Sequence, residues 1–408
     1  MANTGEKQDQ VFGGAATTMS ENASKSMLDA NSRNELDIDE AAEKKLLRKL
    51  DLWIVPPVML LYLFSFLDRV NIGNARLYGL EEDLNMVGND YQLAVSILFV
   101  TYTLSEVPSN LVLKKFTPSR WLAFITTGWG IVATLTGIVQ NFHGLIACRL
   151  ILGALEGGLF PGLTVYLTLF YTKRELALRI GYLFVSSAIA GSMGGLLAYG
   201  IGHMDGIAGL RGWRWILIIE GIPTVLLGIA IYWWLANDAE EAYYLNAEEK
   251  ELMRRRMRRQ TGYTASAKKL QKKDAIAAFK DWKVWVFAVA QFGADVILYG
   301  YSTFLPTIIR GLGDWSIAQV QALTVPCYAL GAITYLITAW ISDRTQRRAF
   351  PVVILGLVSA AGYAILISPV SGGVKYFGCI VVAVGLYVSK SKSPSSHFQL
   401  KLTFFDGR

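Results

Sequence analysis

The feature that most constrains the fold is a series of ten apolar runs separated by short polar stretches. They lie at approximately 53–75, 91–113, 121–140, 143–171, 178–202, 213–235, 284–309, 317–341, 350–369 and 374–388. The first nine reach the ~20 helical residues needed to cross a hydrocarbon core, whereas the tenth has only about fifteen apolar residues. Charged residues make up 17% of the chain, against roughly 25% in soluble domains. The sequence therefore predicts an all-α polytopic membrane protein.

Several other classes of protein are excluded by what the sequence lacks. It has no GxxxxGK[ST] phosphate loop, so ATP hydrolysis is not expected. The few cysteines and histidines are isolated and show neither disulfide-scaffold nor zinc spacing. They are Cys148, Cys327, Cys379, His143, His203 and His397. We expect no enzyme, no cofactor and no metal.

The basic residues are placed as in a membrane protein rather than a nucleic-acid-binding one. The net charge is +7, but the basic residues lie in short stretches between apolar runs and not on a soluble domain. They are most frequent before the first run and after the even-numbered runs, which predicts cytoplasmic N- and C-termini. Residues 1–45 are polar and have no signal-peptide pattern. We expect a multi-pass protein, with the plasma membrane as its favoured location.

These features divide the chain into five parts. A disordered cytoplasmic tail is expected at 1–50, an N-terminal six-helix bundle at 51–235 and a basic cytoplasmic linker at 236–283. A C-terminal bundle of about four helices follows at 284–388, and an atypical polar tail at 389–408. Within the linker, Ala247 to Arg259 is typical either of a helix lying on anionic lipid or of a solvated charged segment.

Ionisable side chains inside the apolar runs are costly and need a specific role. At ~1.5 Å per residue, Asp68 and Arg69 lie in the outer half of the first run, and Arg149 lies at a similar depth in the fourth. Glu156 is two turns further along that run, near mid-depth. Two arginines and two carboxylates could thus meet in one cavity. A guanidinium binds a carboxylate with a planar fork, and a buried carboxylate can load and release a proton.

This constellation fits cotransport of an organic anion with protons, but internal salt bridges within Asp68/Arg69 and Arg149/Glu156 are the alternative. Elsewhere, Glu220 is expected to pair with Arg214 or Arg211 near the outer surface. Asp295, near Tyr299, is as well placed to line the cavity as to serve packing.

Three segments resemble the anion:cation symporters of the major facilitator superfamily, especially fungal allantoate and nicotinate permeases. They are Phe66 to Ala75 (FLDRVNIGNA), Arg149 to Gly162 (RLILGALEGGLFPG) and Phe304 to Ile309 (FLPTII). The resemblance covers about residues 46–388. It implies helical bundles that rock about a central site lined by the first, fourth, seventh and tenth spans.

The resemblance also implies roles for individual residues. Arg69 and Arg149 would bind the substrate carboxylate, while Asp68 and Glu156 would hold the coupling protons. Asn71 and Tyr299 join the candidate substrate-binding residues. The superfamily's loop motif is present after the eighth run, and its gate residues are Asp343, Arg344, Arg347 and Arg348.

The predicted function is secondary active, proton-coupled symport of a small organic anion, such as nicotinate or allantoate, by a monomer in the lipid bilayer. The family has twelve spans and this sequence shows ten, and Val388-Ser389 has the form of a translated intron donor. We therefore expect an incomplete C-terminal bundle. A non-transporting nutrient sensor, or an inactive truncated fragment of such a permease, is the alternative.

Overall fold

The computed structural model describes residues 39–261, 280–345 and 349–386, and in these ranges every regular element is a helix. The predicted tail 389–408 and most of the tail 1–50 lie outside these residues. The elements are α2 Glu40–Leu77, α3 Leu80–Asp83, α4 Asp90–Lys115, α5 Pro118–Thr136, α6 Phe142–Glu156, α7 Leu159–Thr168, α8 Lys173–Gly202, η1 Ile207–Gly209, α9 Gly212–Trp234, α10 Ala247–Thr261, α12 Trp282–Arg310, α13 Ile317–Thr345, α14 Ala349–Ile367 and α15 Gly372–Leu386.

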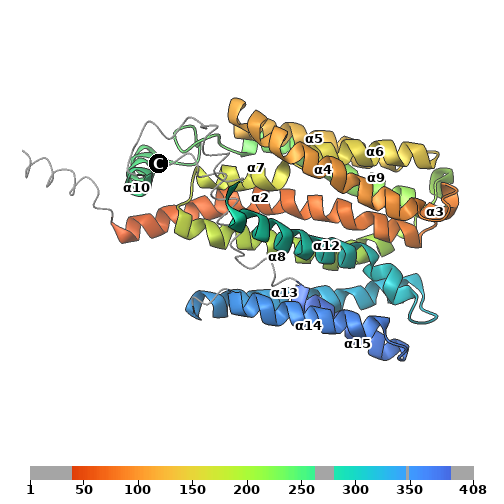
Figure 1. The fold of residues 1–408 in the computed structure, drawn as a ribbon. Helices are drawn as coiled ribbons and strands as arrows, with labels where there is room; N and C mark the ends of the chain where they lie inside the picture. The colour runs from red at the N-terminus through yellow and green to blue at the C-terminus, as the bar shows by residue number, and fades with distance from the viewer. Residues whose placement is uncertain (1–38, 262–279, 346–348, 387–408) are drawn as a thin grey trace, which may run out of the picture.

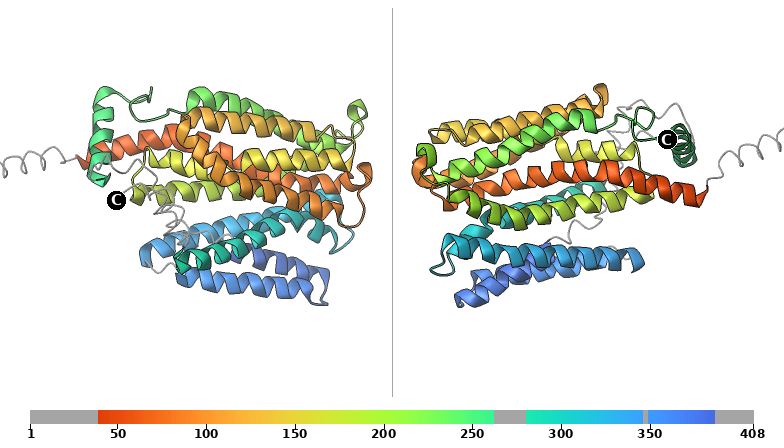
Figure 2. Two further views of the ribbon diagram at one scale, coloured as in Figure 1. Left: turned by 45° about the horizontal axis from the view of Figure 1, so that its top comes forward. Right: turned by 180° about the vertical axis from the view of Figure 1, so that it is seen from behind.

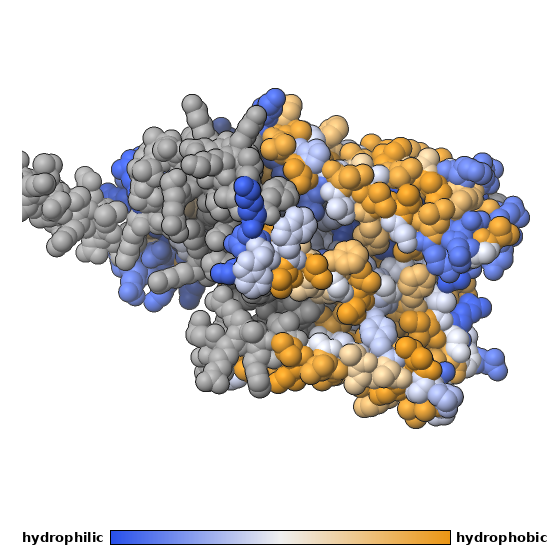
Figure 3. All heavy atoms as spheres, in the orientation of Figure 1, coloured by the Kyte–Doolittle hydropathy of each residue, from blue (hydrophilic) through white to orange (hydrophobic). Residues whose placement is uncertain are grey.

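The long helices run side by side, as Figure 1 shows, and α10 and α3 mark opposite ends of the molecule. We call these the α10 end and the α3 end. Apolar side chains cover most of the visible surface between them, and hydrophilic ones gather at the α3 end (Figure 3). Such an apolar band allows a helix bundle to lie in hydrocarbon. The backbone polar groups of the helices are already paired with one another, so only the side chains face the lipid.

A helix forms at every one of the ten predicted runs. Seven described segments are long and apolar enough to cross a membrane. They are Glu40–Leu77, Asp90–Leu113, Phe142–Thr168, Leu178–Gly202, Gly212–Trp234, Trp282–Arg310 and Ile317–Thr338. The third run forms α5, and the last two form α14 and α15, whose described apolar parts are Val353–Ile367 and Gly372–Leu386.

The fourth run differs from a single straight helix. It is interrupted between α6 and α7 at Gly157 and Gly158, directly after Glu156. Pro161 has no N–H with which to bond the carbonyl of Gly157, which weakens the helix at this point. A side chain at Gly157 would also have no room, since a Cβ there would lie 2.3 Å from the Tyr102 carbonyl oxygen on α4.

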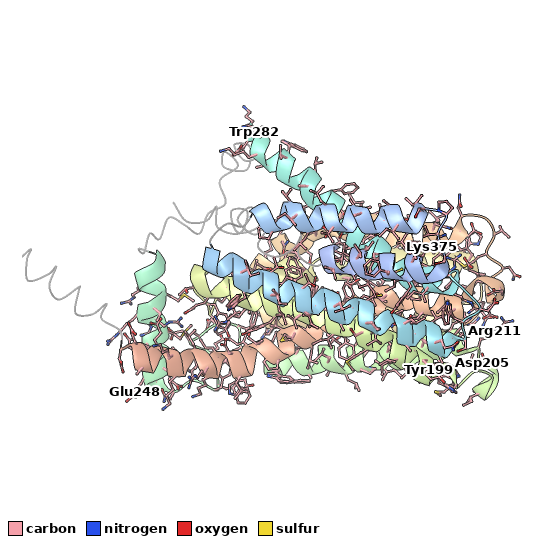
Figure 4. The ribbon with its side chains drawn as sticks, turned by 90° about the horizontal axis from the view of Figure 1, so that it is seen from below. Tyr199, Asp205, Arg211, Glu248, Trp282 and Lys375 are labelled. Carbon is pink, nitrogen blue, oxygen red and sulfur yellow. The ribbon has the colours of Figure 1, made fainter. Side chains whose placement is uncertain are left out.

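The largest buried apolar cluster joins α2, α5, α7, α8, α9 and α10. A second cluster joins α12, α13 and α15 and reaches α8 through Ala188. Figure 2 shows α13, α14 and α15 together on one side of the molecule. At its α10 end, α12 starts at Trp282 well away from the other helices (Figure 4), and apolar side chains such as Phe292 are exposed there.

The linker helix α10 docks on the protein through one face, while charged residues on its other side, such as Arg254 and Arg255, are exposed. Arg256 is 2% exposed and forms ion pairs with Glu43 of α2 at 2.8 Å and Glu175 of α8 at 2.6 Å. Met253 enters the first apolar cluster. The amphipathic pattern was recognised, but its apolar face covers protein instead of lipid.

Candidate functional site

Arg69 of α2 and Glu156 of α6 form a buried ion pair. Arg69 Nε donates to Glu156 Oε1 at 2.8 Å, and the two side chains are 5% and 0% exposed. Ser65, one turn before Arg69 on α2, donates its hydroxyl to the same carboxylate oxygen. Arg69 Nη2 in turn donates to Ser65 Oγ at 3.1 Å.

Tyrosine rings from two further helices enclose the Arg69 guanidinium. Its Nη1 donates to the Tyr299 hydroxyl of α12, and its Cζ lies 5.3 Å from that ring centroid and 4.7 Å from the Tyr102 ring of α4. Cations are attracted to ring faces at such distances. Arg69 therefore joins α2, α4, α6 and α12 at one point, and the expected role of Tyr299 in binding substrate stays a prediction. Ser65 and Tyr102 were missed, although Ser65 is one helical turn from Arg69.

Arg149 lies in the same region without a fixed partner. Its side chain is buried, with 3% exposed, and its Nε has no hydrogen-bond partner in the described part of the chain. Tyr91, Asp68 and Glu156 are close enough to interact with the charge of Arg149, but neither carboxylate lies within ion-pair distance of its guanidinium. Glu156 Oε2 also lacks a hydrogen-bond partner among the described residues. A buried guanidinium without a partner is costly, so an anionic ligand here would relieve that cost.

The structure contains neither of the two salt bridges that were the alternative expectation. Asp68 faces away from Arg69 and accepts a hydrogen bond from Trp129 Nε1 of α5 at 2.9 Å. Neighbouring residues on a helix point in directions about 100° apart, which explains why Asp68 and Arg69 meet different helices. Trp129 could not be recognised from the sequence, because nothing in it specifies how α5 is rotated.

Glu220 is also paired differently from the prediction. Arg214 pairs instead with Asp83 at 2.9 Å, and Glu220, which is 4% exposed, accepts a hydrogen bond from Asn71 Nδ2. Asn71 thus lies with Glu220 and not beside Arg69, and its predicted place near substrate stays untested. The error arose because Glu220 is two turns deeper than Arg214, so it meets α2 rather than the surface.

Of the remaining predicted residues, Asp295 has a described side-chain contact and the four gate residues do not. Asp295 accepts a hydrogen bond from Gln291 on its own helix at 3.0 Å. Of the gate residues, Asp343 and Arg344 lie in the last turn of α13, where their side chains are not described. Arg347 and Arg348 lie outside the described residues.

Comparison with known proteins assigns the fold. The model of the Major Facilitator Superfamily matches residues 58–395. A bacterial homologue of the human lysosomal transporter Spinster, in an inward-facing and unoccupied conformation, has a similar structure with a TM-score of 0.66. It is 15% identical, and the match covers 87% of this chain and 78% of that one.

Fungal transporters are similar in sequence. An uncharacterized transporter of Schizosaccharomyces pombe is 41% identical over 380 residues, which cover 92% of this chain and 76% of the relative. The major facilitator-type transporter hxnP of Emericella nidulans is 34% identical, with 86% and 72% covered. The high-affinity nicotinic acid transporter of Saccharomyces cerevisiae is 35% identical, with 85% of this chain and 64% of that protein covered.

Proposed function

The chain belongs to the major facilitator superfamily of membrane transporters, and we propose that it moves a small organic carboxylate anion together with protons. Proteins of this family are carriers and not enzymes, and this chain is a multi-pass integral membrane protein. We further propose that the α10 end faces the cytoplasm, because the basic residues are concentrated there. The plasma membrane and a monomeric state are part of the same proposal.

The observation that supports an anionic substrate is the unpaired Arg149 beside the Arg69–Glu156 pair. A carboxylate ligand would give Arg149 the planar, two-bonded partner that the described protein does not. Nicotinate is the first probe to use, since a similar fungal protein is a nicotinic acid transporter.

Glu156 is proposed as the proton-coupling carboxyl. It neutralises Arg69 in the structure, and protonation would release the guanidinium for substrate while keeping the site electrically balanced. Asp68 is the second proposed proton carrier, because it is 5% exposed and its described hydrogen-bond donor is Trp129. One proton moving with one monovalent anion would leave the net charge of the site unchanged.

The test is uptake of radiolabelled nicotinate into proteoliposomes under an imposed pH gradient, with uncharged nicotinamide as the competing control. We expect acid outside to drive accumulation and an uncoupler to abolish it. Arg149→Lys should abolish uptake because lysine lacks the planar fork, whereas Arg211→Lys, at an exposed site, should not. Wild-type rates in Arg149→Lys would discard its binding role.

Coupling is tested separately from binding. Glu156→Gln should leave exchange of preloaded nicotinate intact and remove the acceleration by external acid. An unchanged pH response would remove Glu156 as the proton carrier. Nicotinate binding without accumulation in the wild type would instead support the nutrient-sensor alternative.

A further inference from the structure

A chain of buried amides leads from one side of the molecule to Glu220, away from the Arg69 site. Gln321 Nε2 of α13 donates to Asn74 Oδ1 of α2 at 3.2 Å. Asn74 Nδ2 donates to Asn71 Oδ1 at 3.5 Å, and Asn71 Nδ2 donates to Glu220 Oε2 of α9. All four side chains are at most 4% exposed. Every bond donates in the same direction, so Glu220 is the terminal acceptor. We call these four residues the amide chain.

The amide chain lies towards the α3 end, where the helices on either side of it are closely packed. A Cβ at Gly195 of α8 would lie 2.3 Å from Gln321 Oε1, and one at Gly73 of α2 would lie 2.2 Å from the Thr303 carbonyl oxygen of α12. Tyr199, Asp205, Arg211 and Lys375 mark this end in Figure 4, opposite Glu248. The bond between Gln321 and Asn74 joins α13 to α2 and must break if these helices separate.

Glu220 has no cationic partner among the described residues. Its Oε1 has no hydrogen-bond partner in the described part of the chain, and its Oε2 has the Asn71 amide. The positive charge on its own helix, Arg214, pairs with Asp83. On α2, the charges nearest in sequence to Asn71 are Asp68, which lies within electrostatic range, and Arg69, which pairs with Glu156.

The other helices packed against α9 place no charged residue near Glu220 either. The described part of α5 has a single charged residue, Arg120, at its α10 end. The charged residues of α8 all precede Ile180, so its half near the α3 end has none. A buried anion with only an amide partner is far more costly than a neutral carboxyl in the same place.

From this geometry we infer that Glu220 is a further proton-binding site, and that its protonation permits the α3 end to close. When the end is open, water reaches Glu220 and solvates the carboxylate. A proton from the water on that side binds to the free Oε1, the carboxyl becomes neutral, and the amide chain can assemble onto Oε2. Opening breaks the Gln321–Asn74 bond and returns the proton to the same side. The inference rests on the proposed function only for the role of this closure in transport.

The experiment follows the opening of the α3 end directly, without substrate or transport. Spin labels are attached at Val87→Cys, in the α3–α4 loop, and Asp314→Cys, in the α12–α13 loop, in the full chain with Cys148→Ser. Pulsed electron resonance then gives the distance distribution in nanodiscs at a series of pH values. One linked proton changes the closed-to-open ratio up to tenfold per pH unit.

We expect low pH to favour the short distance in the wild type and high pH the long one. Glu220→Gln, which stays neutral, should show the short distance at every pH. Gln321→Leu breaks the amide chain and should shift the distribution towards the long distance at low pH, opposite to Glu220→Gln. General destabilisation would not produce these opposite shifts.

Glu106→Gln is the matched control, since Glu106 is another carboxyl within a span but lies near the α10 end of α4. It should titrate like the wild type. The inference is overturned if the wild-type distances do not respond to pH, or if Glu220→Gln keeps the wild-type response. Absence of nicotinate uptake would count against the proposed function alone, because these distances are measured without it.

Discussion

Replacing Gly153 with alanine tests whether α6, which bears Arg149 and Glu156, is positioned by its close approach to α4. The new Cβ would lie 2.2 Å from the Leu98 carbonyl oxygen and 2.4 Å from Thr101 Oγ1. The carbonyl belongs to helix backbone and cannot rotate away, so the two helices must separate by roughly 1 Å to reach an ordinary contact distance.

The magnitude follows from two opposing effects. Overpacking a well-filled contact costs about 1–3 kcal/mol, and a backbone obstacle belongs at the upper end of that range. Alanine returns about 1 kcal/mol through its higher helix propensity. The net expectation is a loss of ~2 kcal/mol. At roughly 2–4 °C per kcal/mol, the apparent melting temperature should fall by about 4–8 °C.

The assay is thermal unfolding in detergent, followed by tryptophan fluorescence. Gly356→Ala on α14 is the control, because a Cβ there would meet nothing within 4 Å. It should leave the melting temperature unchanged or raise it. If Gly153→Ala melts at or above the wild-type temperature, the contact between α4 and α6 is looser than these distances imply and does not position α6.

Three further predictions concern individual contacts. Arg256→Leu leaves Glu43 and Glu175 without their cation, and because both are partly exposed we expect a cost of roughly 2 kcal/mol. The backbone amides of α10 should then exchange hydrogen about 30-fold faster, and unchanged exchange would contradict the docking. Although burial alone would raise the pKa of Glu249, hydrogen bonds from Lys49 and the Asn246 backbone lower it. Its stabilising effect should therefore be full above about pH 4.3 and be lost as pH falls through the lowered value, so Glu249→Gln should lower the melting temperature at pH 7 but not in strong acid. Trp129→Phe removes the hydrogen bond to Asp68 and should destabilise the protein by about 1–3 kcal/mol, which a melting temperature equal to the wild type would refute.

The helices were predictable from the sequence because a membrane demands long apolar segments with internally paired backbones. The constant rise per residue placed Arg69 level with Arg149 and Glu156 two turns further along, whereas the structure pairs Arg69 with Glu156. What the sequence did not determine was the rotation of each helix about its axis. That rotation directs Asp68 to Trp129 and Glu220 to Asn71.

The linker shows a second limit of the same kind. An amphipathic helix has one apolar face whether it lies on lipid, in water against a charged surface, or on another part of the chain. The docked position of α10 depends on Glu43 and Glu175, which are far from Arg256 in sequence and contact it only once α2 and α8 are packed. Local pattern alone does not contain that information.

The ion pairs of Arg256 also bear on the order in which the protein is assembled. Glu43 belongs to the first described helix, yet its partner is synthesised 213 residues later. At about 5–20 residues per second, a ribosome needs on the order of ten to forty seconds to cover that distance. Over the last 81 residues of this interval, Glu43 and Glu175 have both been made and still lack the arginine that joins them.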